Sequence, residues 1–191
     1  GKDRIQCYHE NDPINCSWDD DKIDIVLECT GKFNSRDESF KHIEAGAKKV
    51  IVSAPCKDAD QTVVYGVNHK NISKTDHIIS VASCTTNCLA PLVFAIHKNF
   101  KIEKGYMTTI HSYTSDQRLL DNSHKDLRRA RSAPNAIVPT STGAAKSLRM
   151  IIPELANKID GISIRIPTPN VSLVQLSFNS KKKLRSIIVL Y

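Results

Sequence analysis

Short, almost uninterrupted apolar runs constrain the fold of this chain most, because they fit strands that are buried on both faces of a sheet. Residues 23–29 (IDIVLEC) form the first such run, and residues 49–53 (KVIVS) form the second, which stops before Pro55. Between the two, Ser35 and Glu38 have the spacing of a capping box that opens a helix. A strand, a helix and a second strand in this order are typical of an open α/β sheet.

The alternation continues to about residue 83, and the pattern then changes. Residues 62–67 and 77–82 form two further β-like runs, which extend the predicted sheet. The later part mixes element types: a helix over 85–100 with Pro91 near its first turns, a strand over 106–111, a polar loop over 112–139, a helix from a Thr142 cap to about Ala156, and strands over 162–166 and 171–178.

Composition excludes several classes of protein. The chain has 191 residues, and its closest glycines, Gly31 and Gly46, are 15 positions apart. Neither G-x-G-x-x-G nor G-x-x-x-x-G-K-[ST] can be written, so both glycine-rich phosphate loops are absent from the sequence. An apolar fraction of 40% with 25% charged residues is ordinary for a globular core. No apolar run approaches the roughly 18 residues of a membrane span, and no signal-peptide pattern is visible, so we expect no membrane partner.

Six cysteines are scattered along the chain without a C-x-x-C pair. That usage favours reduced thiols and a cytoplasmic location over a disulfide framework. Cys84 and Cys88 are the nearest pair, and the flanking His77 and His97 do not complete a metal-ligand spacing. We therefore expect no metal site.

The formal net charge of +7 comes largely from two basic clusters, residues 125–131 and 181–185. Neither is a basic helix face interleaved with aromatic residues, so nucleic-acid binding is a minor alternative. Its test is affinity for nucleic acid at low salt.

The sequence predicts that Cys84 is a reactive nucleophile. It lies in residues 83–88 (SCTTNC), where a predicted strand gives way to a helix whose unpaired N–H groups favour a thiolate. His111 ends the next β-like segment and is the candidate base, because the ends of adjacent strands meet in space. The alternative is a cysteine that only packs, as we expect for Cys88 one turn further on. A Cys–His pair alone does not separate hydrolysis, acyl transfer and oxidation.

Hydroxyl, backbone and guanidinium donors stand at the ends of the predicted elements, and such groups bind phosphate. Each also has an ordinary interpretation as a cap or a surface charge. Together they favour a phosphorylated substrate. They are Thr85, Thr86, Thr114, Arg129, Thr140, Ser141, Thr142, Gly143 and Arg165.

Several stretches resemble phosphorylating glyceraldehyde-3-phosphate dehydrogenase in their order and separation. The most specific is residues 82–91 (ASCTTNCLAP). The others are 28–33 (ECTGKF), 51–55 (IVSAP), 111–114 (HSYT), 124–131 (HKDLRRAR), 139–146 (PTSTGAAK) and 165–171 (RIPTPNV). The resemblance covers about residues 1–179. Erythrose-4-phosphate dehydrogenases share much of the pattern and are the alternative within this class.

The resemblance implies an NAD-dependent oxidoreductase of glycolysis that converts glyceraldehyde 3-phosphate and inorganic phosphate to 1,3-bisphosphoglycerate. Cys84 would be the nucleophile, which forms a thiohemiacetal and then a thioester, and His111 would be its base. Thr114 and Arg165 would bind the phosphate of the substrate. The attacking phosphate would be bound by Ser83, Thr85, Arg129, Thr142 and Gly143, and the cofactor by Thr30, Gly31, Phe33, Ser53 and Ala54.

The resemblance also implies the fold and the assembly. Residues 1–83 would be the C-terminal part of a Rossmann-like α/β dinucleotide-binding domain. Residues 84–179 would be part of an α+β catalytic domain with a mostly antiparallel sheet. The polar loop would reach the cofactor site of a neighbouring subunit in a homotetramer, and residues 180–191 (SKKKLRSIIVLY) would be a tail unlike the family.

Two parts of the family pattern have no counterpart in the sequence. One is the N-terminal strand with its glycine-rich turn and ribose-binding acid, and the other is the C-terminal part with a nicotinamide-binding Asn. We therefore expect an internal fragment of such an enzyme. It would either act as a dehydrogenase through the residues named above or be a catalytically inactive truncated product.

Overall fold

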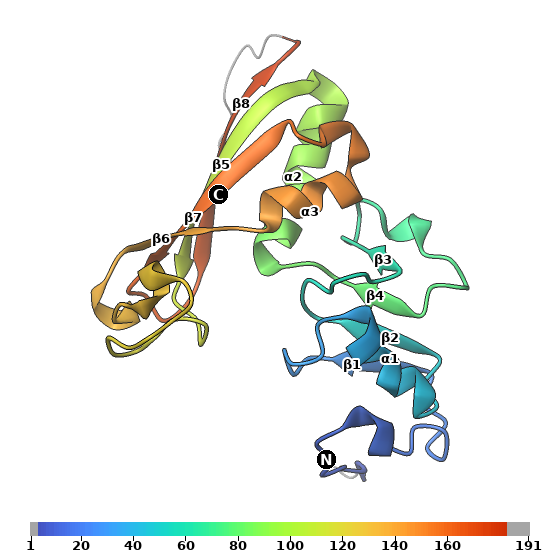
Figure 1. Ribbon diagram of the computed structural model, residues 1–191. Coiled ribbons are helices and arrows are strands. Elements are labelled where there is room, and N and C mark those ends of the chain that lie inside the picture. The colour runs from blue at the N-terminus through green and yellow to red at the C-terminus, as the bar shows by residue number, and fades with distance from the viewer. Residues whose placement is uncertain (1–3, 183–191) are drawn as a thin grey trace. The chain divides into compact units, whose positions relative to one another are not determined.

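The computed structural model describes residues 4–182, and the chain divides into two compact units (Figure 1). The division falls between Ser83 and Cys84, except that residues 64–67 belong to the second unit. The two units are described separately below.

The first unit is built on a four-stranded parallel sheet in the order β1-β2-β4-β3. Short 3-10 turns at Pro13–Asn15 and His69–Asn71 lie among its loops. Its strands and helix are β1 (Ile25–Glu28), β2 (Lys49–Val52), β3 (Gln61–Thr62), β4 (Ile78–Ser80) and α1 (Arg36–Glu44). The sheet confirms the predicted α/β class.

Local signals in the sequence explain α1. The side chain of Ser35 accepts from the N–H of Glu38, and the Glu38 carboxylate accepts from the N–H of Ser35, so the predicted capping box is confirmed. The helix then packs Phe40 and Ile43 against the buried core of β2 and β4. The helix ends at Glu44 with Ala45 as its C-cap, and Gly46 follows with a φ of +110°, which suits glycine and few other residues.

Two sequence predictions are wrong in this unit. The run at 23–29 was expected to be buried on both faces, but the side chains of Ile25 and Leu27 are 52% and 65% exposed. The reason is that, among the described residues, only the face of β1 that carries Val26 and Glu28 is covered. The run at 62–67 gives only the short β3, because the chain turns after it and Gly66 has a φ of +82°.

The second unit is a four-stranded mixed sheet in the order β6-β7-β5-β8. The central pair, β7 and β5, is parallel and both outer pairs are antiparallel, which confirms the mostly antiparallel sheet. Figure 1 shows α2 and α3 side by side against this sheet. The elements are α2 (Cys84–Phe100), β5 (Ile102–Ser112), β6 (Val138–Ser141), α3 (Ala144–Ile151), β7 (Ile159–Ile166) and β8 (Ser172–Ser180), with 3-10 turns at Leu127–Ala130, Ala133–Asn135 and Pro153–Leu155.

The helices of the second unit differ in detail from expectation. Pro91 lies well inside α2 rather than in its first turns. The N-cap of α3 is Gly143, although Thr142 still accepts from the N–H of Ala144 at 3.2 Å. This helix ends at Ile151 rather than near Ala156, because the residue before Pro153 is disfavoured in a helical conformation. The expected tail begins at Ser180, the last residue of β8, and residues 183–191 lie outside the described part.

Candidate active site

The register of the second sheet brings together residues that are far apart in the sequence. His111 of β5 lies opposite Arg165 of β7. Side chains alternate along a strand, so His111 shares its face with Met107 and Thr109, which are buried. On the same face, Thr140 of β6 lies opposite Ser163 of β7. The sheet therefore gives histidine, arginine and threonine side chains a common direction.

Cys84 is the first residue of the 17-residue helix α2, and its side chain is exposed. Its Sγ lies 3.5 Å from Nε2 of His111, which is within hydrogen-bonding range for sulfur. An anionic sulfur at a helix N-terminus is stabilised by the helix dipole and by the N–H groups of the first turn. The structure thus joins the nucleophile and base that the sequence predicted, 27 residues apart.

The other side of the His111 ring faces Arg165 and a backbone carbonyl. Nδ1 lies 2.7 Å from the carbonyl oxygen of Ser112 and 2.9 Å from Nη1 of Arg165, which also donates to that carbonyl at 2.8 Å. With its proton on Nδ1, the ring donates to Ser112, and Nε2 is left to accept the thiol proton. Once Nε2 has taken that proton, both ring nitrogens donate, Nδ1 to the Ser112 carbonyl and Nε2 to the thiolate. The contacts therefore accommodate the ring before and after the proton transfer.

Arg165 is half-buried, and its surroundings lower its pKa below the ordinary value of an arginine. Burial is the main cause and the positive charge of Arg129 adds to it, whereas Cys84 and Asp116 act in the opposite direction. Arg129, Cys84 and Asp116 therefore each lie within electrostatic range of Arg165. Two neighbouring guanidinium groups make a region that favours anions.

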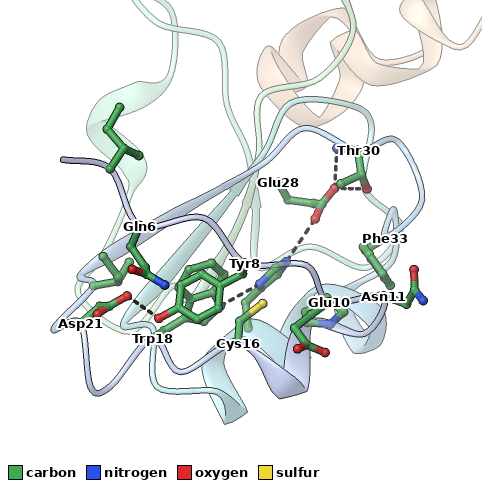
Figure 2. Close-up of a pocket in the computed structure, with 14 residues that line it drawn as sticks. Gln6, Tyr8, Glu10, Asn11, Cys16, Trp18, Asp21, Glu28, Thr30 and Phe33 are labelled. Atoms are coloured by element: carbon green, nitrogen blue, oxygen red, sulfur yellow. Dashed lines mark hydrogen bonds and ion pairs between the residues drawn. The ribbon is translucent and has the colours of Figure 1, made fainter. Parts of the chain in front are cut away.

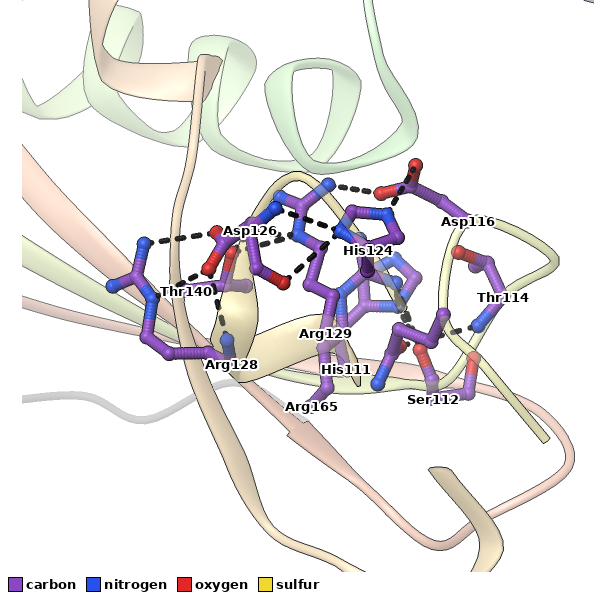
Figure 3. A network of polar contacts seen from close by, with 11 residues as sticks. His111, Ser112, Thr114, Asp116, His124, Asp126, Arg128, Arg129, Thr140 and Arg165 are labelled. Carbon is purple, nitrogen blue, oxygen red and sulfur yellow. Dashed lines mark hydrogen bonds and ion pairs between the residues drawn. The ribbon is translucent and has the colours of Figure 1, made fainter. Parts of the chain in front are cut away.

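Arg129 lies in a polar network that Figure 3 shows. Its Nε and Nη2 donate to the hydroxyl of the buried Thr140 at 3.0 and 2.8 Å, and its Nη1 donates to the carboxylate of Asp116. Asp126 is further away, 3.8 Å from Nε. Sequence reasoning placed Arg129 at a phosphate site but missed Asp116, because a partner 13 residues away in an aperiodic loop leaves no pattern.

The other residues expected to bind phosphate are more dispersed. Thr85 is buried in the first turn of α2, directly after Cys84, and Ser83 directly precedes the helix. Thr142 and Gly143 stand at the start of α3. Thr114 lies in the loop after β5, where its N–H donates to the side chain of Gln117 at 3.3 Å.

The residues expected to bind the cofactor lie in the first unit, after two neighbouring parallel strands. Thr30 and Gly31 follow β1, and Ser53 and Ala54 follow β2. The carboxyl ends of parallel strands form one edge of a sheet, where α/β proteins bind ligands. A Cβ on Gly31 would meet nothing within 4 Å, so there is room for a ligand beside this turn.

A buried network beneath that turn was missed by the sequence analysis (Figure 2). Glu28 accepts from the N–H of Thr30 at 2.7 Å and from its hydroxyl, and lies 3.1 Å from Nε2 of His42. Trp18 donates to the other nitrogen of the same ring at 3.1 Å. Burial alone would raise the pKa of Glu28, but the bonds from Thr30 and His42 outweigh it and lower the value. The carboxylate therefore fixes the start of the turn.

A cavity of about 630 Å³ opens beside this network in the first unit. Figure 2 shows its lining, which combines aromatic rings with acidic and amide side chains. Phe33 contributes to the lining and meets the ring of His42 edge-on. The lining residues are Ile5, Gln6, Tyr8, Glu10, Asn11, Pro13, Cys16, Trp18, Asp21, Ile23, Glu28, Thr30, Phe33 and His42.

Within residues 4–182, no three His, Cys, Asp or Glu side chains are grouped closely enough to hold a metal ion. No helix in the same range has the length and apolar character needed to cross a membrane.

The protein has two parts, a parallel α/β unit and a second unit with a thiol–imidazole site. In the second unit, a cysteine at the N-terminus of a helix faces a histidine. Comparison with known proteins gives the family. The model for the glyceraldehyde 3-phosphate dehydrogenase C-terminal domain matches residues 83–188, more than half of the chain. The chain therefore belongs to the glyceraldehyde-3-phosphate dehydrogenase family.

Individual relatives agree. The chain is 55% identical over 175 residues to a glyceraldehyde-3-phosphate dehydrogenase of Geobacillus stearothermophilus, covering 91% of this chain and 52% of that protein. For those of Zymomonas mobilis and Xanthobacter flavus, identity is 55% over 176 residues and 58% over 160 residues. The match covers 92% and 84% of this chain, and 52% and 48% of the relatives. The chain thus spans about half the length of the curated relatives it matches.

Proposed function

We propose that this chain carries the acyl-transfer centre of an NAD-dependent dehydrogenase that oxidises and phosphorylates glyceraldehyde 3-phosphate. The observation that carries the proposal is the 3.5 Å contact between Cys84 Sγ and His111 Nε2 at the start of α2, beside Arg165. The names of the relatives support the substrate.

The first step forms a bond between Cys84 Sγ and the aldehyde carbon. His111 takes the thiol proton and returns it to the carbonyl oxygen, which becomes the hydroxyl of a thiohemiacetal. The same imidazole then accepts that hydroxyl proton as hydride leaves the carbon. NAD, when bound, supplies the hydride acceptor. The product of this half-reaction is a thioester on Cys84.

Inorganic phosphate then attacks the thioester carbonyl, the carbon–sulfur bond breaks, and Cys84 departs as a thiolate. The products of the complete cycle are an acyl phosphate, the reduced cofactor and one proton. Arg165 and Thr114 would bind the phosphate that the substrate already carries. The attacking phosphate would be bound by Ser83, Thr85, Arg129, Thr142 and Gly143, through the donors that such anions require.

The cofactor would be held at the carboxyl edge of the first sheet by Thr30, Gly31, Phe33, Ser53 and Ala54. The hydroxyl of Thr30 already donates to Glu28 and accepts from the N–H of Lys32 at 3.1 Å. Thr30 would therefore shape this site rather than supply a free hydroxyl to the ligand.

A homotetramer is part of the proposal, supported by one open face of the second sheet. Tyr106, Ile110 and Leu173 share that face, since Ile110 lies opposite Leu173 and Tyr106 is four residues before Ile110. Their exposed fractions are 49%, 37% and 56%. We also place the protein in the cytoplasm, which suits six free cysteines.

The test of the function is the reduction of NAD, followed at 340 nm, by the purified chain with glyceraldehyde 3-phosphate and inorganic phosphate. We expect turnover that requires phosphate and is abolished in Cys84→Ser. A preference for erythrose 4-phosphate would replace the proposed substrate. Absence of turnover with either aldehyde would contradict activity of this chain.

A further inference from the structure

The contacts of Arg129 have a consequence for the attacking phosphate. A guanidinium group has two edges that can bind an oxyanion in a bidentate manner. Thr140 takes the Nε–Nη2 edge of Arg129, and its hydroxyl is anchored on β6 with the residue only 1% exposed. The Nη1 corner is therefore the part of the group left for a ligand, and the Asp116 carboxylate lies there.

The two partners of Arg129 differ in how firmly they are held. Asp116 belongs to the loop between β5 and β6, and its side chain is 52% exposed. Its second oxygen is near Nε2 of His124, at 3.9 Å. Nδ1 of His124 lies 2.9 Å from the backbone nitrogen of Asp126 and 3.0 Å from its carbonyl oxygen. When Nδ1 accepts from that N–H, the ring proton is on Nε2, which faces Asp116. The carboxylate thus has a second place to turn to when it leaves Arg129.

We propose that Asp116 is an internal competitor of phosphate: its carboxylate occupies Arg129 in the ligand-free site, and the attacking phosphate must displace it. This inference rests on the proposed function, because it assigns the anion that Arg129 binds. Because phosphate must displace the carboxylate, Asp116 lowers the affinity of the site for phosphate. The alternative role has the opposite consequence. If Asp116 instead holds Arg129 in position for phosphate, removal of the Asp116 carboxylate weakens phosphate binding.

The test compares Asp116→Asn with the unaltered chain. Asn keeps the shape of the side chain and removes its charge. We measure the binding of inorganic phosphate by calorimetry, and the alkylation rates of Cys84 with anionic iodoacetate and neutral iodoacetamide. Half-exposed ion pairs contribute modestly, so we expect phosphate to bind about two- to fivefold more tightly and the iodoacetate-to-iodoacetamide rate ratio to rise by a similar factor.

Asp121→Asn is the matched control. Asp121 belongs to the same loop and pairs with Arg131 at 3.3 Å, so its substitution changes the net charge equally without freeing Arg129. We expect neither phosphate affinity nor the rate ratio to change in this variant. The double variant Asp116→Asn/Arg129→Gln should lose the gain in phosphate affinity, since the freed guanidinium of Arg129 causes that gain.

Unchanged or weaker phosphate binding in Asp116→Asn, with a folded chain by circular dichroism, would overturn the inference. An equal gain in phosphate affinity in Asp121→Asn would also overturn it, because the change in net charge alone would then explain the effect. Calorimetry does not depend on thiol reactivity. A chain that binds phosphate as expected but shows no preferential alkylation of Cys84 would contradict the proposed function and leave the role of Asp116 standing.

Discussion

At the scale of single residues, a partly buried carboxylate in the first unit, that of Asp60, accepts several donors. Asp60 accepts from the N–H groups of His77 and Ile78, both at 2.8 Å, and from Arg36 at 2.9 Å. Burial alone would raise the pKa of Asp60, but these three bonds together lower it below the ordinary 3.8. The charge of Asp60 therefore ties α1, through Arg36, to the start of β4.

Asp60→Asn should destabilise the first unit by about 1–3 kcal/mol at pH 7, since bonds to a charged acceptor are lost. A lowered pKa means that this stabilisation is complete above about pH 4 and is lost as the pH falls through the folded-state value. The difference between the variant and the original should therefore shrink at pH 3. Urea unfolding followed by fluorescence reports on this unit, because Trp18 is the single tryptophan.

The exposed Asp58→Asn serves as the control, with an expected change under about 0.5 kcal/mol. An equal cost in both variants, or a cost for Asp60→Asn that does not depend on pH, would refute the role assigned to Asp60.

At the scale of elements, the turn after α1 depends on one glycine. Gly46 has a φ of +110°, and a Cβ there would lie 2.5 Å from Cβ and N of Asp19. The position combines an unfavourable conformation with a close approach of another segment, so no side chain fits without a shift of backbone.

Gly46→Ala should therefore lower stability by about 2–4 kcal/mol, whereas Gly66→Ala should cost about 1 kcal/mol. Gly66 also has a positive φ, +82°, but nothing lies within 4 Å of its Cβ position. Thermal unfolding by circular dichroism measures both. A cost for Gly66→Ala as large as that for Gly46→Ala would contradict the steric argument.

Sequence patterns predicted the elements that have local signals. They failed where contacts between distant segments determine the structure. The capping box of Ser35 is local, and the structure contains it. The exposure of Ile25 depends instead on which face of β1 other segments cover, and no run of apolar residues specifies that. The 3.5 Å Cys84–His111 contact was predictable because both residues end or begin regular elements. The contact between Glu28 and His42 was not predictable. Helix α1 places His42 beside Glu28, which is 14 positions earlier, and no sequence pattern indicates that contact.

At the scale of the whole molecule, self-association is the prediction to test. The exposed face that carries Tyr106, Ile110 and Leu173 has three large apolar side chains, and a charge in its middle should prevent another copy from covering it. Ile110→Lys should shift the chain from an oligomer to a monomer in sedimentation velocity. Ile72→Lys places the same charge on a loop residue of similar exposure, 39%, and should leave the oligomer intact. A monomeric unaltered chain would contradict the proposed assembly.

The central claim is that position and partner activate Cys84, and thiol labelling tests it most directly. Cys88 is another exposed cysteine one turn along the same helix, so it is an internal reference. With limiting iodoacetamide near pH 7, mass spectrometry should find Cys84 alkylated at least about tenfold faster than Cys88. His111→Asn should remove most of that preference. Equal labelling of the two cysteines in the unaltered chain would contradict the account.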